Sequence, residues 1–113
     1  MSRDLRLYLE DIREHCVEIA DHVRGLDYQG FLSERSTYKA VLYSLLVIGE
    51  AANHVPEELR SRYPEVEWRR ITGLRNVLAH GYFALRDPAL WEIVRADVPA
   101  LREQMERILS DLT

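Results

Sequence analysis

The sequence has few of the features that cross-link a chain through disulfides, anchor it in a membrane or direct its export. Cys16 is the only cysteine among 113 residues, so no disulfide forms within one chain. The longest apolar run, from Ala40 to Gly49, is interrupted by Ser44 and falls far short of the ~20 residues that a membrane-spanning helix needs. The opening residues MSRDLRLYLEDIREH are charged throughout and hold no apolar signal core. These absences predict a cytoplasmic protein.

Lysine is also scarce, and the balance of charge is acidic. The formal net charge is −4, which argues weakly against nucleic acid as a partner because phosphate binding relies on positive charge. Lys39 is the only lysine, so nearly all positive charge is arginine, which suits phosphate geometry better. One stretch interleaves five arginines with four glutamates: Arg60, Arg62, Arg69, Arg70 and Arg75, with Glu57, Glu58, Glu65 and Glu67. Such a mixture is typical of a solvated surface.

Helical periodicity is the main signal that is present. Apolar residues recur at steps of four and three between Ser2 and Arg24, which predicts a long first helix. The stripe consists of Leu5, Leu9, Ile12, Cys16, Ile19, Val23 and Leu26. Cys16 is therefore expected to be a packed thiol. The segment from Gly25 to Leu32 holds two glycines and is predicted as a connection.

A second helix is predicted from Ser33, a residue type favoured at N-caps, to Asn53. It is apolar almost all round between Ala40 and Ala52, which predicts the central, buried helix of the fold. Gly49 has poor helix propensity, and we expect it to mark close contact with a neighbouring helix.

A short helix is predicted between Pro56 and Pro64, because proline is favoured at a helix start and disfavoured in its interior. A longer helix is predicted from Glu67 to His80, with Gly81 as a left-handed C-terminal cap.

The last region starts with Asp87, predicted as an N-cap, followed by Pro88 at the first helical position. Asp97 and Pro99 repeat that signature, so the helix is predicted to break and restart there, ending near Leu112. Strand alternation is not convincing anywhere. The whole chain, residues 1–113, is thus predicted to be a single all-α domain, a bundle of about four to five helices.

The stretch RNVLAHGYF, at positions 75 to 83, brings an arginine and a histidine close together in sequence. Arg75 and His80 are five residues apart, so on an ideal helix their side chains point about 140° apart. They converge only if the helix unwinds at Gly81 or if a second subunit brings its own copy. The spacing alone is nearly uninformative, and the alternative is that His80 caps the helix while Arg75 pairs with an acid.

A longer pattern is more specific. The chain reads IGEAANHVPEELRSRYP, then WRRITGLRNVLAHGYF, then DPALWEIVRADVPAL. Over most of its length it resembles the HepT-like family of the HEPN superfamily. That family's RNxxxHxY signature is intact as Arg75, Asn76, His80 and Tyr82.

This resemblance implies a small helical homodimer. It further implies a metal-independent ribonuclease toxin without a cofactor, neutralised by a minimal nucleotidyltransferase antitoxin. Arg75 and His80 would then be the catalytic pair in a cleft between subunits, and Tyr82 the residue to which the antitoxin attaches AMP.

The chemistry suits these residue types. RNA carries its own nucleophile, the 2′-OH, so cleavage needs proton transfer and stabilisation of the phosphate charge. His80 titrates near neutrality, and Arg75 can fork onto two phosphate oxygens. Asn76 could orient the imidazole or donate to phosphate. Tyr82 could hydrogen-bond or stack on the substrate, and adenylylation would add bulk and negative charge there.

Glu50 lies in an apolar helix, where an unpaired carboxylate is costly. It is expected either to orient Arg75 or His80, or to be an ordinary buried ion-pair partner or a residue at the dimer seam.

Four residues of metal-ligand type form a stripe on the first helix: Asp11, His15, Glu18 and His22. This stripe is interpreted as a solvated polar face, and no metal is expected. His54 is expected to lie at the end of the second helix without a further role. Trp68 and Trp91 are expected to anchor the core.

Two rival functions stay open. In one, the same helical dimer is a non-catalytic module that binds nucleotide or RNA, or scaffolds a nucleotidyltransferase, which the acidic net charge favours. In the other, the bundle is purely structural, and Arg75 pairs with a carboxylate of its own subunit, away from any cleft.

Overall fold

The structure of the protein is a computed structural model, which describes residues 4–80 and 86–112 apart from the side chains at 79 and 80. In chain order its helices are α1 (Leu5–Val23), α2 (Tyr28–Ser33), α3 (Arg35–Asn53), α4 (Glu57–Arg62), α5 (Trp68–His80), α6 (Asp87–Glu92), the π-helical turn η2 (Ile93–Asp97) and α7 (Val98–Asp111). No β-strand occurs over these two ranges. The predicted all-α class is confirmed. None of the helices in this part of the chain is both long and apolar enough to cross a membrane.

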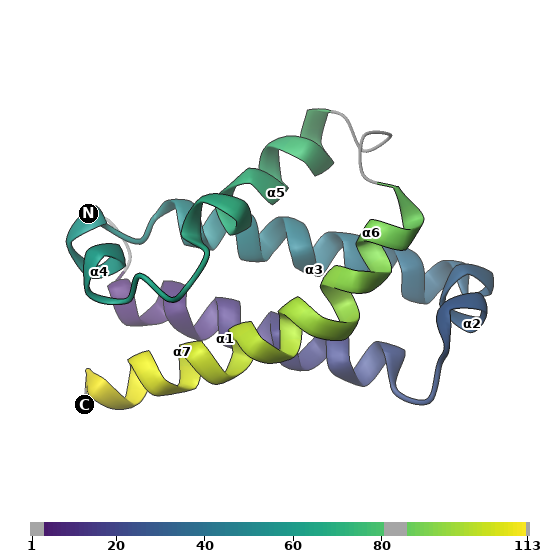
Figure 1. Ribbon diagram of the computed structural model, residues 1–113, viewed down its shortest axis with the longest axis horizontal. Helices are drawn as coiled ribbons and strands as arrows, with labels where there is room; N and C mark the ends of the chain where they lie inside the picture. Colours follow the sequence, from purple (N-terminus) through teal and green to yellow (C-terminus); the bar gives the residue numbers. More distant parts are fainter. Residues whose placement is uncertain (1–3, 81–85, 113) are drawn as a thin grey trace.

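The four long helices form a bundle with α3 at its centre (Figure 1). α3 packs against both α1 and α5, and α7 lies along α1. Their inward faces share one core, to which α1 contributes Leu9, Ile12, Cys16 and Ile19, α3 contributes Val41, Leu45 and Ile48, and α7 contributes Met105 and Ile108, all buried. The predicted stripe is thus confirmed from Leu5 to Val23, as is the packed thiol of Cys16, whereas Leu26 lies beyond α1.

The start of the chain differs from the prediction in one place. The carboxylate of Asp4 accepts the backbone N–H of Arg6 at 3.0 Å, and α1 begins at the next residue after Asp4. Gly25 adopts φ +80° and follows α1, as expected of a glycine after a helix. The predicted connection, however, contains α2. Asp27 caps this short helix by accepting the N–H of Gly30 at 2.8 Å, and the ring of Phe31 is fully buried. The two glycines of this segment predict an irregular connection. The burial of Phe31, a tertiary contact that the local sequence does not reveal, accompanies the helix found there.

The predicted N-cap at Ser33 is wrong. Ser33 ends α2, and its hydroxyl donates to the carbonyl of Gln29 at 2.8 Å. Glu34 occupies the N-cap of α3 without a side-chain cap bond. α3 is central, as predicted, but it is not covered all round, because Tyr43 is 63% exposed and Glu50 is half-exposed. Over residues 4–80 and 86–112, one face of α3 is therefore only partly covered.

The two middle helices follow the prediction. α4 begins after Pro56 and ends before Pro64, and α5 begins at Trp68, one residue later than expected. Trp68 is buried, and its indole N–H donates to the carbonyl of Tyr63 at 3.0 Å, which confirms its expected role as an anchor. The predicted cap at Gly81 lies outside the described residues.

The C-terminal region is more continuous than predicted. Arg86, and not Asp87, occupies the N-cap of α6. The predicted break at Asp97 is absent, since its φ of −73° and ψ of −39° are helical. Instead the N–H of Val98 donates to the carbonyl of Ile93, five residues back, which widens the helix by one residue just before Pro99. Because proline has no N–H to donate, this π-turn accommodates it without ending the helix.

Gly49 marks the predicted close contact, between α3 and α5. A Cβ placed there would lie 2.9 Å from the backbone nitrogen of Arg75 and 3.2 Å from the carbonyl oxygen of Ile71. Both neighbours are backbone atoms of α5, so they cannot yield by changing a rotamer. The absent side chain therefore sets how closely the two helices approach at Arg75.

The substitution Gly49→Ala is expected to lower the free energy of unfolding by about 1–3 kcal/mol, because overpacking pushes α5 away from α3. Gly73→Ala is the matched control within α5, since no atom would lie within 4 Å of its new Cβ. The control is expected to raise the free energy of unfolding by roughly 0.5–1 kcal/mol through helix propensity alone. Urea unfolding followed by circular dichroism measures both. Equal effects of the two substitutions would contradict the close-contact explanation.

A second prediction concerns Tyr38, which ties the start of α3 to the start of α6. Its hydroxyl donates to Asp87 Oδ1 at 2.6 Å. Burial first, and then the hydrogen bond and negative charge of Asp87, raise the pKa of Tyr38 from its ordinary 10.0 to about 12. The folded chain thus favours neutral tyrosine, and this stabilisation is complete below pH 10.0 and is lost as the pH rises to about 12. Urea midpoints measured across that range should fall less in Tyr38→Phe than in the parent. Parallel curves would show that the hydroxyl carries no such linkage.

Candidate active site

Three of the four signature residues, Arg75, Asn76 and His80, lie towards the C-terminal end of α5. Arg75 and Asn76 are exposed in its last two turns, and His80 is its final residue. α5 stays helical up to His80, so the backbone positions of Arg75 and His80 keep the angular separation that an ideal helix gives. The side chain of His80 and the whole of Tyr82 lie outside the described residues, as does any unwinding at Gly81.

Arg75 pairs with Glu50 across the contact between α5 and α3. The closest atoms are Arg75 Nε and Glu50 Oε1, and the two side chains are 46% and 50% exposed. Gly49 precedes Glu50, so the same close approach that Gly49 permits brings the carboxylate beside the guanidinium. Glu50 was expected to be an orienting partner of Arg75 or His80, an ordinary buried ion-pair partner, or an exposed residue at the dimer seam. It is an ion-pair partner of Arg75, but it is not buried.

The second oxygen of Glu50 has a partner of its own. His54 Nε2 lies 3.3 Å from Glu50 Oε2, one helical turn further along α3. The imidazole in turn stacks on the ring of Tyr8 from α1, with centroids 4.6 Å apart and ring planes 5° from parallel. A continuous series of contacts therefore joins α5, α3 and α1.

These groups line an open hollow of ≈ 570 Å³ on the surface of the bundle. Its lining residues come from α1, α3 and α5: Tyr8, Asp11, Leu46, Val47, Glu50, Ala51, His54 and Arg75. Apolar side chains line the hollow together with the charged side chains of Asp11, Glu50 and Arg75. Such a surface suits a ligand that has both a flat apolar part and an anionic part, as a nucleotide has.

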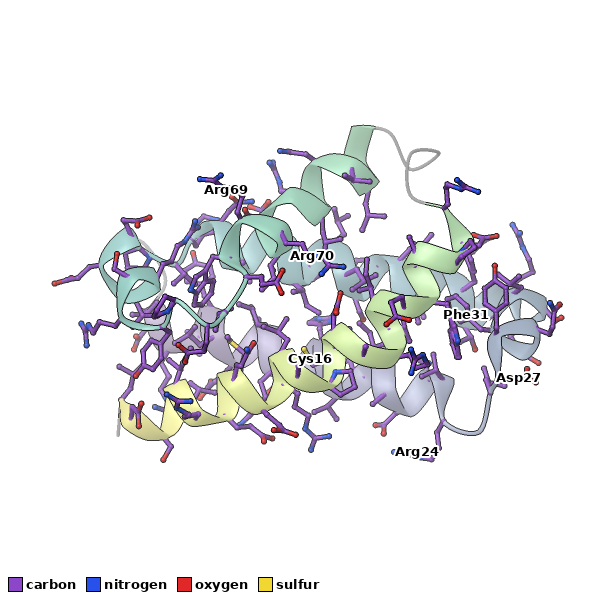
Figure 2. The ribbon with its side chains drawn as sticks, in the orientation of Figure 1. Cys16, Arg24, Asp27, Phe31, Arg69 and Arg70 are labelled. Atoms are coloured by element: carbon purple, nitrogen blue, oxygen red, sulfur yellow. The ribbon has the colours of Figure 1, made fainter. Side chains whose placement is uncertain are left out.

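A second, smaller hollow of ≈ 100 Å³ lies beside α5 and α7 and includes Arg70 and Asp97. Arg70 pairs with Asp97 of η2 at 2.9 Å. Figure 2 shows Arg70 on the side of α5 that faces this helical segment, whereas Arg69 projects away from the bundle. Neither Arg75 nor Asn76, the two signature residues whose side chains the structure describes, lines this hollow, whereas Arg75 lines the wider one, which is therefore the candidate site.

The other candidates behave as structural residues. His15 Nδ1 lies 3.0 Å from the hydroxyl of Ser44, and Glu18 is 3.9 Å away. Across the described residues, no group of three or more His, Cys, Asp or Glu side chains is placed to hold a metal ion. Burial raises the pKa of the Cys16 thiol to about 12, which makes it an unreactive packed group. The ring of Trp91 packs against Phe31 with centroids 5.2 Å apart.

The sequence did not single out His54 and Tyr8 as site residues. His54 does end α3, as expected, but its contact with Glu50 also brings it into the site. The four-residue spacing in GEAANH was a usable signal for that contact. Nothing in the sequence indicates Tyr8, because its stacking on His54 depends on how α1 and α3 are aligned.

A family model described as "Ribonuclease HepT-like" matches residues 12–108, which is most of the chain. This chain belongs to the HepT-like ribonuclease family. The resemblance inferred from the RNxxxHxY signature is thereby confirmed, and that signature falls inside the matched range.

HepT-like relatives of similar length show the same likeness. A protein of Thermococcus cleftensis named "Probable ribonuclease HepT" is 34% identical over 108 residues, covering 96% of this chain and 98% of its own. A protein of Methanocaldococcus jannaschii named "Putative RNase" is 35% identical over 105 residues, covering 93% of this chain and 96% of its own. A protein of Caldanaerobacter subterraneus, also named "Putative RNase", is 34% identical over 104 residues, covering 92% of this chain and 93% of its own. No solved structure gives a significant match.

The exposure of the Arg75–Glu50 pair leads to a prediction about stability. Half-exposed ion pairs contribute little, so Glu50→Gln is expected to change the free energy of unfolding by less than about 1 kcal/mol. Ile48→Ala, two residues earlier and fully buried, should cost about 2–5 kcal/mol and serves as the reference. Urea unfolding of both variants tests this. A loss for Glu50→Gln as large as that for Ile48→Ala would mean that the pair holds α5 onto α3.

Proposed function

We propose that this protein is a metal-independent endoribonuclease that acts as a homodimer, with Arg75 and His80 as its catalytic residues. The observation that carries the proposal is the position of the signature. Arg75, Asn76 and His80 lie towards the C-terminal end of α5, and Arg75 lines a wide hollow. All three fall within the residues that match the HepT-like ribonuclease family. The substrate is proposed to be RNA because the reaction needs a 2′-OH.

The proposed reaction is an internal transfer that needs no outside nucleophile. The 2′ oxygen of RNA forms a bond to phosphorus, and the bond from phosphorus to the 5′ oxygen breaks. One proton leaves the 2′-OH and another reaches the 5′ oxygen, so the products end in a 2′,3′-cyclic phosphate and a 5′-hydroxyl. His80, the last residue of α5, transfers these protons in the proposed reaction.

Arg75 stabilises the charge that builds on the phosphate. Its contact with Glu50 runs through Nε, at the side of the guanidinium. The end-on edge, formed by the two terminal nitrogens, is the edge that can fork onto two phosphate oxygens. Glu50 therefore acts as a positioning residue for Arg75 in this proposal. Asn76, exposed beside Arg75, is proposed to orient the imidazole or to donate to the phosphate.

A second copy of the chain is proposed to complete the site. The angle between positions 75 and 80 keeps the two groups of one helix apart, whereas two chains meeting near α5 bring two copies of each group together. The partly covered face of α3 is consistent with such a partner. Tyr43 there is 63% exposed, and the apolar side chains of Leu46 and Val47 line the hollow.

Regulation is proposed to follow the HepT-like pattern, in which the protein is the toxin of a toxin-antitoxin pair. A cognate minimal nucleotidyltransferase would attach AMP to Tyr82, two residues after His80. The added phosphate and bulk would repel and obstruct RNA at the same cleft.

The rival candidate is a non-catalytic module that binds nucleotide or RNA. One observation favours it: the carboxylate of Glu50 partly neutralises Arg75, in a chain whose net charge is already −4. The purely structural alternative expected Arg75 to pair with an acid of its own subunit away from any cleft. The pair exists, but both of its side chains line the hollow.

Cleavage of labelled RNA in the presence of a metal chelator tests the proposal. The parent protein is expected to release fragments that end in cyclic phosphate. Arg75→Ala and His80→Ala are each expected to lower the cleavage rate by about 10²–10⁴-fold while remaining folded.

Two variants serve as matched controls. Arg102→Ala removes an exposed arginine of α7 that pairs with Glu106, and His22→Ala removes an exposed histidine in the last turn of α1. Both are expected to cleave at the parent rate. Binding without fragments would favour the non-catalytic module, and undiminished cleavage by Arg75→Ala or His80→Ala would overturn the assignment of roles.

A further inference from the structure

We propose that His54 and Tyr8, which lie outside the signature, are positioning residues that fix the Arg75 guanidinium through Glu50. The inference rests on the proposed ribonuclease function for its effect on rate. Its geometry does not, because the contacts from Arg75 to Glu50, from Glu50 to His54 and from His54 to Tyr8 are all features of the folded chain.

The Arg75–Glu50 pair alone is too weak to hold a guanidinium still. Both side chains are about half-exposed. Pairs of this kind contribute little, because solvent screens the attraction and both long side chains lose rotamer freedom. A phosphate-binding arginine on such a surface therefore needs a further constraint to keep one orientation.

His54 supplies that constraint by holding the second oxygen of Glu50. Oε1 faces Arg75 and Oε2 faces His54 Nε2 at 3.3 Å, so the carboxylate is held at both oxygens. A carboxylate with two partners cannot rotate about its terminal bond without losing one of them. The four-residue spacing on α3 keeps His54 on the same helical face as Glu50.

Tyr8 in turn holds the ring of His54. A single hydrogen bond leaves an imidazole free to swing about its side-chain torsions, particularly at the end of a helix. The nearly parallel stack, with centroids 4.6 Å apart, fixes the plane of the ring from α1. The position of Arg75 on α5 is thus set in part by α1, although α1 carries no signature residue.

The expected effect is on the chemical step. With its support loosened, Arg75 still meets the phosphate but samples other orientations, so transition-state stabilisation falls more than substrate affinity does. His54→Ala is expected to lower kcat by up to about 100-fold, with KM near the parent value. His54→Gln, whose side-chain amide can still donate to Glu50, should restore most of the loss.

Tyr8 offers a second pair of variants. Tyr8→Leu removes the aromatic stack and is expected to lower kcat in the same way, while Tyr8→Phe keeps the ring and should remain near the parent rate. His22→Ala is the control for His54→Ala, because it also removes a histidine, but one that is exposed and does not line the hollow. If His54→Ala does not fold, His54→Gln and the Tyr8 pair still carry the test.

A double-mutant cycle decides whether His54 acts through Glu50. If it does, the variant carrying both Glu50→Gln and His54→Ala should cleave no more slowly than Glu50→Gln alone. Losses that multiply would show that the two residues act independently and would overturn the proposal. Parent-like kcat in His54→Ala, or equal loss in Tyr8→Phe and Tyr8→Leu, would overturn it as well.

A spectroscopic measurement separates this inference from the proposed function. The Nε–H signal of Arg75 in a nitrogen-15 correlation spectrum, assigned by its absence in Arg75→Ala, reports the pair with Glu50 directly. It should shift and exchange faster with solvent in His54→Ala, and return towards the parent position in His54→Gln. If the parent fails to cleave RNA while the signal responds as expected, the proposed function fails and the positioning contacts stand. An unresponsive signal would overturn the inference whatever the activity.

Discussion

The close approach of α3 and α5 at Gly49 is the constraint on which the candidate site depends. With no side chain at that position, the backbone of Arg75 can lie against α3, where a Cβ would come within 2.9 Å of its nitrogen. That contact makes Glu50, the next residue on α3, the natural partner of the Arg75 side chain. A packing feature of the core thus determines which acid the signature arginine meets at the surface.

The same helix, α3, serves two environments. Its inner residues, such as Leu45 and Ile48, are buried against α1 and the rest of the core. Two of its outer residues, Leu46 and Val47, line the hollow beside its charged groups. They are the apolar surface that the proposed second subunit would cover.

Local patterns predicted most of the fold, because the periodicity of apolar residues and the residues that begin or end a helix determine most of the helices. The stripe of α1 and the two prolines around α4 are examples. The failures occur where a distant contact or a backbone adjustment decides. α2 exists because Phe31 is buried, and η2 lets the backbone pass Pro99 without a break. In the site, Arg75 and Glu50 could be predicted from sequence, but the stacking of Tyr8 on His54 could not, since it depends on the alignment of two helices.

The distribution of ion pairs bears on how an acidic chain could bind the phosphate of the proposed substrate. Several of its acids pair with arginines three or four residues away in the sequence, as in Arg6–Glu10, Arg24–Asp21, Arg95–Glu92 and Arg102–Glu106. Such local pairs largely cancel at a distance, so the net charge of −4 is a poor guide to the potential at any one point. Within the described part of the chain, Arg75 is the one arginine that lines the wider hollow. Recognition of an anion there must come from short-range geometry more than from long-range attraction, which is why the contacts that orient this single guanidinium matter.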